Sequence, residues 1–534
     1  MTPVTVHIDE TTGPPGRPPA PPAPSGGSEP PAPPEFRLPA WRLTLTVGVV
    51  VLGGLLFGFD TGVVSGALLF LKDDFQLTSF QEGAVISSLL LGAAAGALWS
   101  GRLADRWGRR RTLIAVAVTF TLGLLLATVS AGFWTLVAAR VVLGLAVGSA
   151  SSLVPLYLAE VAPARLRGRL ITVNQIMLTA GILVSYLINL WFAGDADWRA
   201  MFGAGLVPSV VMLIGLFFVP ESPVWEARRQ RERADGSGSG NGNGAPGREA
   251  AGEPVRSAPR GMLSEPVVRR ALLIGLTIGA VQQFAGINTI IYYAPSIMSR
   301  AGLPATNSIM YSVAIGVANL LMTVAAIPLV DRAGRKPLLV GSLVGMAVAL
   351  VPLGFALNGV FGGASHLVSL VSMGLYVSAF AVGIGPVFWI LSAEVFPPAV
   401  RARGAALCAL VNWAANFVVG QLFLPAADVL GEAAVFWFFA AVCVAALVFV
   451  LRVVPETKNR SFDAIQRDLE AGTAAARRKR RAASVPAPTP APVPASVPAP
   501  TPAPVPVPVP APVPAPAPTP APVPAPGPLP VAHD

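Results

Sequence analysis

The stretch Asp105-Arg-Trp-Gly-Arg-Arg110 follows a long apolar segment, and Asp331-Arg-Ala-Gly-Arg-Lys336 follows another such segment later in the chain. A second pair recurs in the same order, because Ala159-Glu-Val-Ala-Pro163 and Ala393-Glu-Val-Phe-Pro397 each end an apolar segment. One basic loop would be weak evidence, but two motifs repeated in register indicate a duplicated unit. The members of each pair lie six apolar segments apart, so the sequence predicts two parallel six-helix halves.

The composition indicates a membrane protein. Of the 534 residues, 53% are hydrophobic and 12% are charged, and the mean hydropathy is +0.63. A soluble domain carries roughly twice that share of charge. Apolar segments of about 20 residues recur along most of the chain, which predicts an all-α polytopic fold. We expect twelve spans, at about 42–70, 84–101, 112–131, 134–157, 170–193, 200–219, 271–298, 308–330, 337–358, 366–392, 402–425 and 434–454.

The chain divides into five parts on this pattern. Residues 42–219 and 271–454 are expected to form the two six-helix bundles. Between them, residues 220–270 form a loop with a Gly/Ser/Asn-rich linker, and we expect short helices near 222–233 and 261–268. The N-terminal residues 1–41 and the Pro-rich residues 455–534 are expected to be disordered tails.

The basic residues predict the orientation in the membrane. Most Lys and Arg of the short loops lie on one side, which is the cytoplasmic side by the positive-inside rule. An even number of spans then places both termini in the cytoplasm. Because the net charge of +10 is explained by these loops, no nucleic-acid partner is expected. No cleavable signal peptide is predicted, and Cys408 and Cys443 lie in spans, which argues against a disulfide framework.

Two charged residues lie inside apolar spans. Asp60 belongs to the first span and Arg140 to the fourth, at similar depths below the outer end. A carboxylate at membrane depth costs several kcal/mol, so it is rarely present without a partner and a use. We expect the two residues to pair, and protonation of Asp60 to be linked to release of the pair. The alternative is a static pair that only holds helices together.

No other titratable group is placed to carry a proton at the midplane. Glu160 and Glu394 lie at cytoplasmic helix ends, and the three histidines lie in tails or a loop: His7, His366 and His533. By elimination Asp60 is the expected proton carrier.

The remaining polar residues within spans suit a sugar. A sugar ring needs side-chain amides, which both donate and accept hydrogen bonds, and a flat aromatic surface. The amide candidates are Gln175, Gln282, Gln283, Asn288, Asn319, Asn412 and Asn416. The aromatic candidates are Phe57, Tyr292, Tyr293, Trp389 and Trp413. We expect the seventh span to break at Gly286, and the tenth near Gly383, Gly385 and Pro386, which would turn these side chains inward. Each amide on its own could equally serve only helix packing.

Several motifs together resemble the sugar porter family of the major facilitator superfamily, between about residues 42 and 468. They are Gly58-Phe-Asp-Thr-Gly62, Gly101 to Arg110, Arg140-Val-Val-Leu-Gly144, Pro155 to Glu160, Pro220-Glu-Ser-Pro223, Gln282 to Asn288, Gly385-Pro386 with Trp389, and Pro455-Glu-Thr-Lys458. The resemblance implies hexose contacts at Gln175, Gln282, Gln283, Asn288, Asn319, Trp389 and Asn412, with Trp413 near the sugar. It also implies an outer gate at Tyr292 and Tyr293, and it supports a proton-coupling Asp60.

The resemblance further implies a cytoplasmic charge network that pairs across the halves and latches an outward-facing state. Its members are Arg109, Arg110, Glu160, Arg167, Glu221, Arg335, Glu394 and Arg401. Two departures from the family pattern are Ile182, which stands where some pentose transporters have a glutamine, and Val224, which stands where a basic residue is usual.

We therefore expect a proton-coupled monosaccharide importer of a bacterial cell membrane, with glucose or a similar hexose as its substrate. A facilitative uniporter, or a symporter of a pentose or a polyol, are the alternatives. The expected partners are the sugar, the proton and the lipid bilayer, and the protein is expected to be monomeric. No HExxH or GxSxG motif is visible, so no enzyme activity, metal or cofactor is expected.

Overall fold

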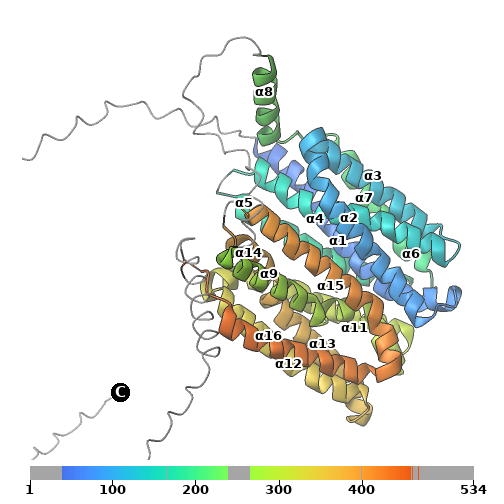
Figure 1. Ribbon diagram of the computed structural model, residues 1–534. Coiled ribbons are helices and arrows are strands. Elements are labelled where there is room, and N and C mark those ends of the chain that lie inside the picture. Colours follow the sequence, from blue (N-terminus) through green and yellow to red (C-terminus); the bar gives the residue numbers. More distant parts are fainter. Residues whose placement is uncertain are drawn as a thin grey trace, which may run out of the picture. The chain divides into compact units, whose positions relative to one another are not determined.

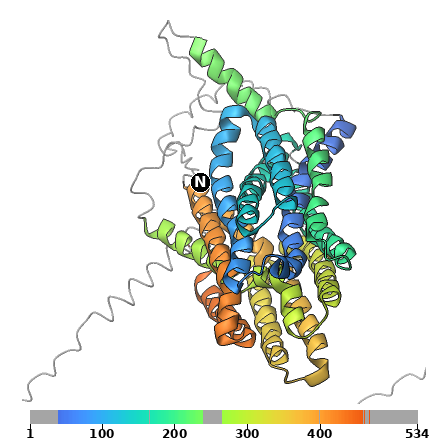
Figure 2. The same ribbon diagram turned by 90° about the vertical axis from the view of Figure 1, so that its right-hand side faces the viewer.

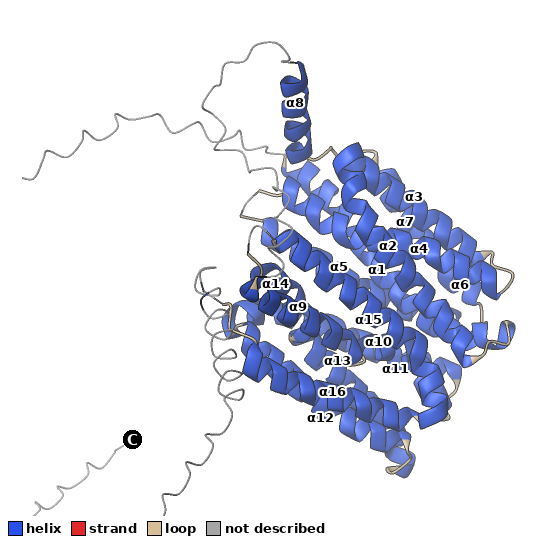
Figure 3. Ribbon diagram, in the orientation of Figure 1, coloured by secondary structure: helices blue, strands red, loops and turns tan. Residues whose placement is uncertain are grey.

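The computed structural model describes residues 39–163, 165–237, 265–397, 400–458, 460 and 467. This described part consists of helices and connecting loops without a strand (Figure 3). Most of the expected tails and linker, and the start of the short helix expected at 261–268, lie outside the described residues.

Six apolar spans make up the first half of the chain. They are formed by α1 (Ala40–Asp74), α2 (Ser79–Trp107), α3 (Arg109–Thr128), α4 (Phe133–Val161), α5 (Arg167–Phe192), and α6 (Trp198–Gly203) with α7 (Leu206–Leu216). The shorter α8 (Pro223–Ser237) follows, where a short helix was expected near 222–233.

The second half repeats this number of spans. They are formed by α9 (Pro266–Phe284) with α10 (Ile287–Arg300), α11 (Ala305–Ala333), α12 (Arg335–Leu357), α13 (Ser365–Val382) with α14 (Ile384–Glu394), α15 (Arg401–Leu430) and α16 (Glu432–Val453). A short 3₁₀ turn, η2 (Gly362–Ala364), precedes α13. In Figure 1 the first half runs from blue to green and the second from green to red.

The twelve helical spans among the described residues confirm the sequence prediction. Most helices are longer than the apolar segments, because their polar ends continue past them. At the start of α2, for example, the Gln81 backbone N–H donates to the Thr78 hydroxyl, and the Thr78 N–H donates to the Gln81 side chain at 2.9 Å. This capping box starts the helix at Ser79, five residues before the expected span.

Small residues let the helices within a half approach closely. A Cβ atom added to Gly58 of α1 would lie 1.8 Å from the backbone oxygen of Leu178 in α5. On the facing helix, a Cβ at Gly181 would lie 2.1 Å from the Leu55 oxygen. Between membrane helices, such close backbone contact supplies packing energy that the hydrophobic effect does not. The α1–α5 contact holds Asp60 at a fixed depth.

The two halves meet through helix pairs that reflect the duplication. Helix α2 packs on α15, α5 on α11, and α1 on α10. We call the end of the bundle with Arg109 and Arg335 the basic end, and the end with Asp74 and Arg300 the opposite end. Figures 1 and 2 show α8 beyond the basic end in two views.

Polar contacts join the halves toward the opposite end. The Ser87 hydroxyl of α2 donates to the Gln421 Oε1 of α15 at 2.6 Å, and Gln421 Nε2 donates to the Phe80 oxygen at 3.0 Å. We call these three groups the Gln421 clasp. Gly83 lies against it, since a Cβ there would be 2.5 Å from the Gln421 backbone oxygen. The Tyr186 hydroxyl also crosses between the halves, donating to the Ile291 oxygen at 2.8 Å.

Replacing Gly58 by alanine is expected to destabilise the bundle, because the new methyl group would overlap the α5 backbone. Overpacking of this kind costs about 1–3 kcal/mol. Gly48→Ala in the same helix is the matched control, since nothing lies within 4 Å of a Cβ there. Unfolding of the purified protein in detergent measures both. Equal stability of the two variants would contradict the close α1–α5 contact.

Replacing Gln421 by leucine is expected to loosen the opposite end, because it removes both hydrogen bonds of the clasp. If the clasp stabilises the closed opposite end by about 1 kcal/mol, its loss shifts the equilibrium toward opening of that end about fivefold. Both native cysteines are buried, so a thiol introduced as Ile86→Cys at this interface can report on opening. We expect about fivefold faster thiol labelling in Gln421→Leu than in the parent. The exposed control Gln230→Leu should not change the rate, and unchanged labelling in Gln421→Leu would contradict the role of the clasp.

Candidate functional site

The two charged residues within the apolar spans form a buried ion pair. Arg140 Nη1 of α4 donates to Asp60 Oδ1 of α1 at 2.8 Å, and each residue is only 1% exposed. Arg140 Nε also donates to the Val85 backbone oxygen in α2 at 3.2 Å. The expected contact is therefore present, and it ties three helices of the first half together.

The pair leaves one acceptor unused. Asp60 Oδ2 is buried and has no hydrogen-bond partner among the described residues. Burying a carboxylate oxygen without a hydrogen-bond donor costs free energy. Protonation of this oxygen would remove the charge and lower that cost. Whether Asp60 takes up a proton stays a prediction.

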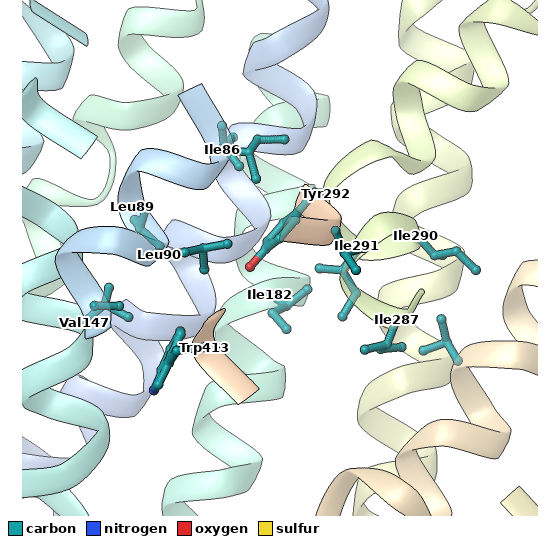
Figure 4. Close-up of a cluster of buried hydrophobic side chains, with 14 of the residues drawn as sticks. Ile86, Leu89, Leu90, Val147, Ile182, Ile287, Ile290, Ile291, Tyr292 and Trp413 are labelled. Carbon is teal, nitrogen blue, oxygen red and sulfur yellow. The ribbon is translucent and has the colours of Figure 1, made fainter. Parts of the chain in front are cut away.

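Tyr292 connects this pair to the second half. It lies on α10, within electrostatic range of Asp60 and Arg140, and close to the Asn416 side chain of α15. Figure 4 shows the Tyr292 hydroxyl pointing toward Leu90, with Ile182 and Trp413 in the same apolar cluster. The neighbouring expected gate residue, Tyr293, donates from its hydroxyl to the Gly420 oxygen at 2.7 Å.

Four of the expected sugar-binding amides form one network in the second half. Asn412 Nδ2 donates to Gln282 Oε1 at 2.6 Å, and Gln283 Nε2 donates to Asn412 Oδ1 at 3.2 Å. Asn288 Nδ2 donates to Gln283 Oε1 at 2.7 Å. Gln282 Nε2 reaches the Gly385 oxygen at 3.1 Å. The network thus spans α9, α10, α14 and α15.

Breaks in two spans produce this arrangement. Gly286 separates α9 from α10 with a φ of +94°, a conformation that favours glycine. This turn brings Asn288 back onto Gln283, which it could not reach along a regular helix. The tenth span breaks at Gly383, where the Ile384 N–H donates to the Ser342 hydroxyl at 3.2 Å. Both breaks confirm the sequence expectation.

The other expected contacts are placed differently. Phe57 of α1 and Trp413 of α15 face each other across the halves, with ring centroids 6.2 Å apart. Asn319 is buried on α11, whereas Gln175 is exposed on α5 and Trp389 is 48% exposed on α14. Among the described residues, neither Gln175 nor Asn319 hydrogen-bonds to the amide network. Their expected roles stay predictions.

The basic end of the first half is held by a carboxylate at a helix start. Glu221 Oε1 accepts the backbone N–H groups of Arg109 and Arg110 at 2.8 and 2.9 Å. These are unpaired donors of the first turn of α3, where a negative charge is favourable. The Arg109 guanidinium pairs with Glu160 Oε2 at 3.0 Å.

The second half contains the same corner. Glu456 accepts the backbone N–H groups of Arg335 and Lys336 at 3.0 and 2.9 Å, and Arg335 Nη2 pairs with Glu394 at 2.9 Å. Burial acts to raise the pKa of Glu456, but the hydrogen bonds from the backbone N–H groups outweigh it and hold this pKa below its usual value. Gly108 and Gly334 begin the two corners with φ values of +100° and +96°.

Two ion pairs of this network, Arg109–Glu160 and Arg335–Glu394, each lie within one half. Arg110 donates to the Leu216 oxygen of its own half at 3.0 Å, and Arg401 donates to the Phe396 oxygen at 3.4 Å. Arg167 is exposed at the start of α5. Pairing across the halves was expected of an outward-facing state, and it stays a prediction for that state.

Two residues of this arrangement were not assigned a role from the sequence. Gln421 could have been found in the same way as the amides predicted to bind sugar, because it too is a polar residue inside an apolar span. Glu456 could have been found from the repeat, because Pro220-Glu-Ser and Pro455-Glu-Thr each follow the last span of a half. No group of His, Cys, Asp or Glu side chains able to hold a metal occurs among the described residues.

Comparisons with known proteins agree with this architecture. The family model described as "Sugar (and other) transporter" matches residues 46–469. The glucose transporter GlcP of Staphylococcus epidermidis is 40% identical, over 79% of this chain and 96% of its own length. The galactose-proton symporter of Escherichia coli is 38% identical, over 79% and 94%.

Solved structures give the same result. The inward open conformation of the xylose transporter XylE from E. coli matches with a TM-score of 0.66 and 30% identity, over 79% of this chain and 99% of that one. This chain is therefore a multi-pass membrane protein that belongs to the sugar transporter family of the major facilitator superfamily.

Proposed function

We propose that this protein is a proton-coupled importer of a monosaccharide, with glucose or a similar hexose as its substrate. The observation that carries the proposal is the buried Asp60–Arg140 pair with its unpartnered Asp60 oxygen. The names of the relatives support sugar as the cargo, since they include a glucose transporter, a galactose-proton symporter and a D-xylose transporter.

The proposed coupling starts at Asp60. When the carboxylate takes up a proton, the attraction that holds Arg140 Nη1 at 2.8 Å is lost. Of the two contacts of the Arg140 guanidinium described above, only the hydrogen bond to the Val85 oxygen then remains. The helices that the pair ties together, α1, α2 and α4, are freed to repack against the second half.

The sugar acts on the other half. Its hydroxyls would replace the bonds that the amides Gln282, Gln283, Asn288 and Asn412 now make with one another. Tyr292 would join the two events, because it belongs to the same broken span as Gln282, Gln283 and Asn288 and lies within electrostatic range of Asp60 and Arg140. Sugar binding and protonation of Asp60 would therefore both change the contact between α1 and α10.

The contacts between the halves support an inward-facing state. The Gln421 clasp and the Tyr186 contact join the halves toward the opposite end, while the Arg109–Glu160 and Arg335–Glu394 ion pairs at the basic end each lie within one half. The positive-inside rule predicts that the basic end and both termini lie in the cytoplasm, so the proposed arrangement is inward-facing. The match to inward open XylE supports this assignment.

A facilitative uniporter is the competing function, in which the Asp60–Arg140 pair is only structural. A symporter and a uniporter differ in the ratio of internal to external sugar that each can reach. A potential of 100 mV supplies about 2.3 kcal/mol per proton, enough to accumulate sugar about 40-fold. A uniporter reaches a ratio of 1 whatever the potential.

Replacing Asp60 by asparagine is expected to abolish uphill accumulation and to preserve sugar exchange, because the amide keeps the shape but cannot take up a proton. Proteoliposomes with an imposed proton gradient measure accumulation, and counterflow measures exchange. Asp73→Asn is the matched control, since Asp73 is an exposed residue of the same helix. Accumulation that persists in Asp60→Asn would show that another group carries the proton.

Replacing Asn412 by alanine is expected to weaken sugar binding, because it removes the amide that would donate to and accept from the sugar hydroxyls in the proposed site. Two neutral hydrogen bonds contribute about 1–3 kcal/mol, or about 5- to 150-fold in KM. Counterflow with glucose, galactose, xylose, arabinose and inositol as competitors measures the loss and the preference. The exposed Asn307→Ala is the control. A stronger preference for xylose or inositol than for glucose would reject the hexose assignment but not transport.

A further inference from the structure

A cavity of about 830 Å³ opens at the basic end, between the start of α3 and α8. Its lining includes Arg110, Arg111, Phe217, Trp225, Arg229 and Arg233. None of these residues touches the amide network or the Asp60–Arg140 pair, so the cavity is separate from the proposed transport site.

The polar groups of the cavity are not all available to a ligand. Glu221 is occupied by the backbone N–H groups of Arg109, Arg110 and Ser222. Arg110 is occupied by the backbone oxygens of Leu216 and Phe217. These contacts belong to the fold of the corner.

Three arginines remain. Arg111 and Arg233 form no hydrogen bond or ion pair with another described residue. Arg229 lies over the Trp225 ring, 5.0 Å from its centroid, and Trp225 is fixed by a 2.9 Å hydrogen bond from Nε1 to the Asp105 oxygen. Glu226 is the one other acid in the lining, so the cavity keeps an excess of positive charge.

The internal repeat shows that this excess is not required by the fold. The corner of the second half has the same glycine, the same basic pair and the same capping glutamate, at Gly334, Arg335, Lys336 and Glu456. Pro337 stands there at the position of Arg111. The corner therefore forms without a third basic residue, so the fold of the corner does not require Arg111.

Apolar side chains lie beside these charges. Ile114 and Phe217 line the cavity, and Phe217 and Phe218 are 59% and 74% exposed. They lie where the third span begins and the sixth span ends. This is the depth at which the phosphate of a lipid meets its acyl chains.

We propose that the cavity binds a phosphate group, and that the group belongs to the headgroup of an anionic phospholipid. Guanidinium groups match phosphate geometry well, and basic pockets between membrane helices bind such headgroups. Arg111 and Arg233 hold the phosphate, while the acyl chains lie along Ile114 and Phe217. A bound lipid thus joins α8 to α3. This site is independent of the proposed transport function.

The test uses the purified full chain and short-chain phosphatidylglycerol, with phosphatidylcholine and inorganic phosphate as separate arms. Native mass spectrometry counts retained lipid, and thermal unfolding measures stabilisation. The double variant Arg111→Gln/Arg233→Gln is compared with Arg102→Gln/Arg106→Gln, which removes the same charge from exposed positions at the same end, outside the cavity lining.

We expect the parent and the control to retain phosphatidylglycerol at least about fivefold better than the cavity variant, with phosphatidylcholine retained weakly by all three. Unfolding without lipid should be the same for the three proteins, which excludes misfolding as the cause. If the control variant lost as much phosphatidylglycerol as the cavity variant, the lipid would be held by diffuse attraction to surface charge, and the proposed site would be wrong. Stabilisation by inorganic phosphate but not by lipid would assign the cavity to a soluble phosphate and overturn the lipid.

Discussion

Hydrocarbon offers no hydrogen-bond partner, and this constraint decides where every polar group of the bundle lies. Asp60 and Arg140 satisfy most of their needs with each other, and the amides of the second half satisfy theirs within one network. Polar side chains therefore pair with one another between helices, while leucine and valine side chains both fill the core and cover the exposed faces. Asp60 Oδ2 is one of the buried side-chain atoms that have no hydrogen-bond partner among the described residues.

Because of the duplication, the two halves use the same structural motifs. Each half turns between its second and third spans at a glycine with positive φ, and closes that corner with a glutamate from beyond its sixth span. The capped helix start and the neighbouring arginine–glutamate pair recur together. The halves differ at Arg111 and Pro337 and at the amide network, and the proposals above give these positions a function in one half only.

Much of this could be predicted from the sequence. Apolar length fixes the spans, the repeated loops fix the two halves, and a lone acid and a lone base at similar depth predict the ion pair. Helix ends such as Ser79 were misplaced because polar caps extend helices past their apolar part. The mutual bonding of the amides and the Gln421 clasp could not be predicted, since both depend on which faces of distant helices meet. The exposure of Gln175 and Trp389 could not be predicted either, because it depends on how α5 and α14 pack against distant helices.

The self-bonded amides have a consequence for the return journey of an empty carrier. Asn412 is shared between Gln282 and Gln283, and Asn288 is held on Gln283, so these amides satisfy one another within the apolar spans. In the proposed transport cycle a sugar would exchange these hydrogen bonds for its own, so its net binding free energy would be small and its release fast. The same mutual bonding would let the sugar-free protein change state without burying unpaired amides.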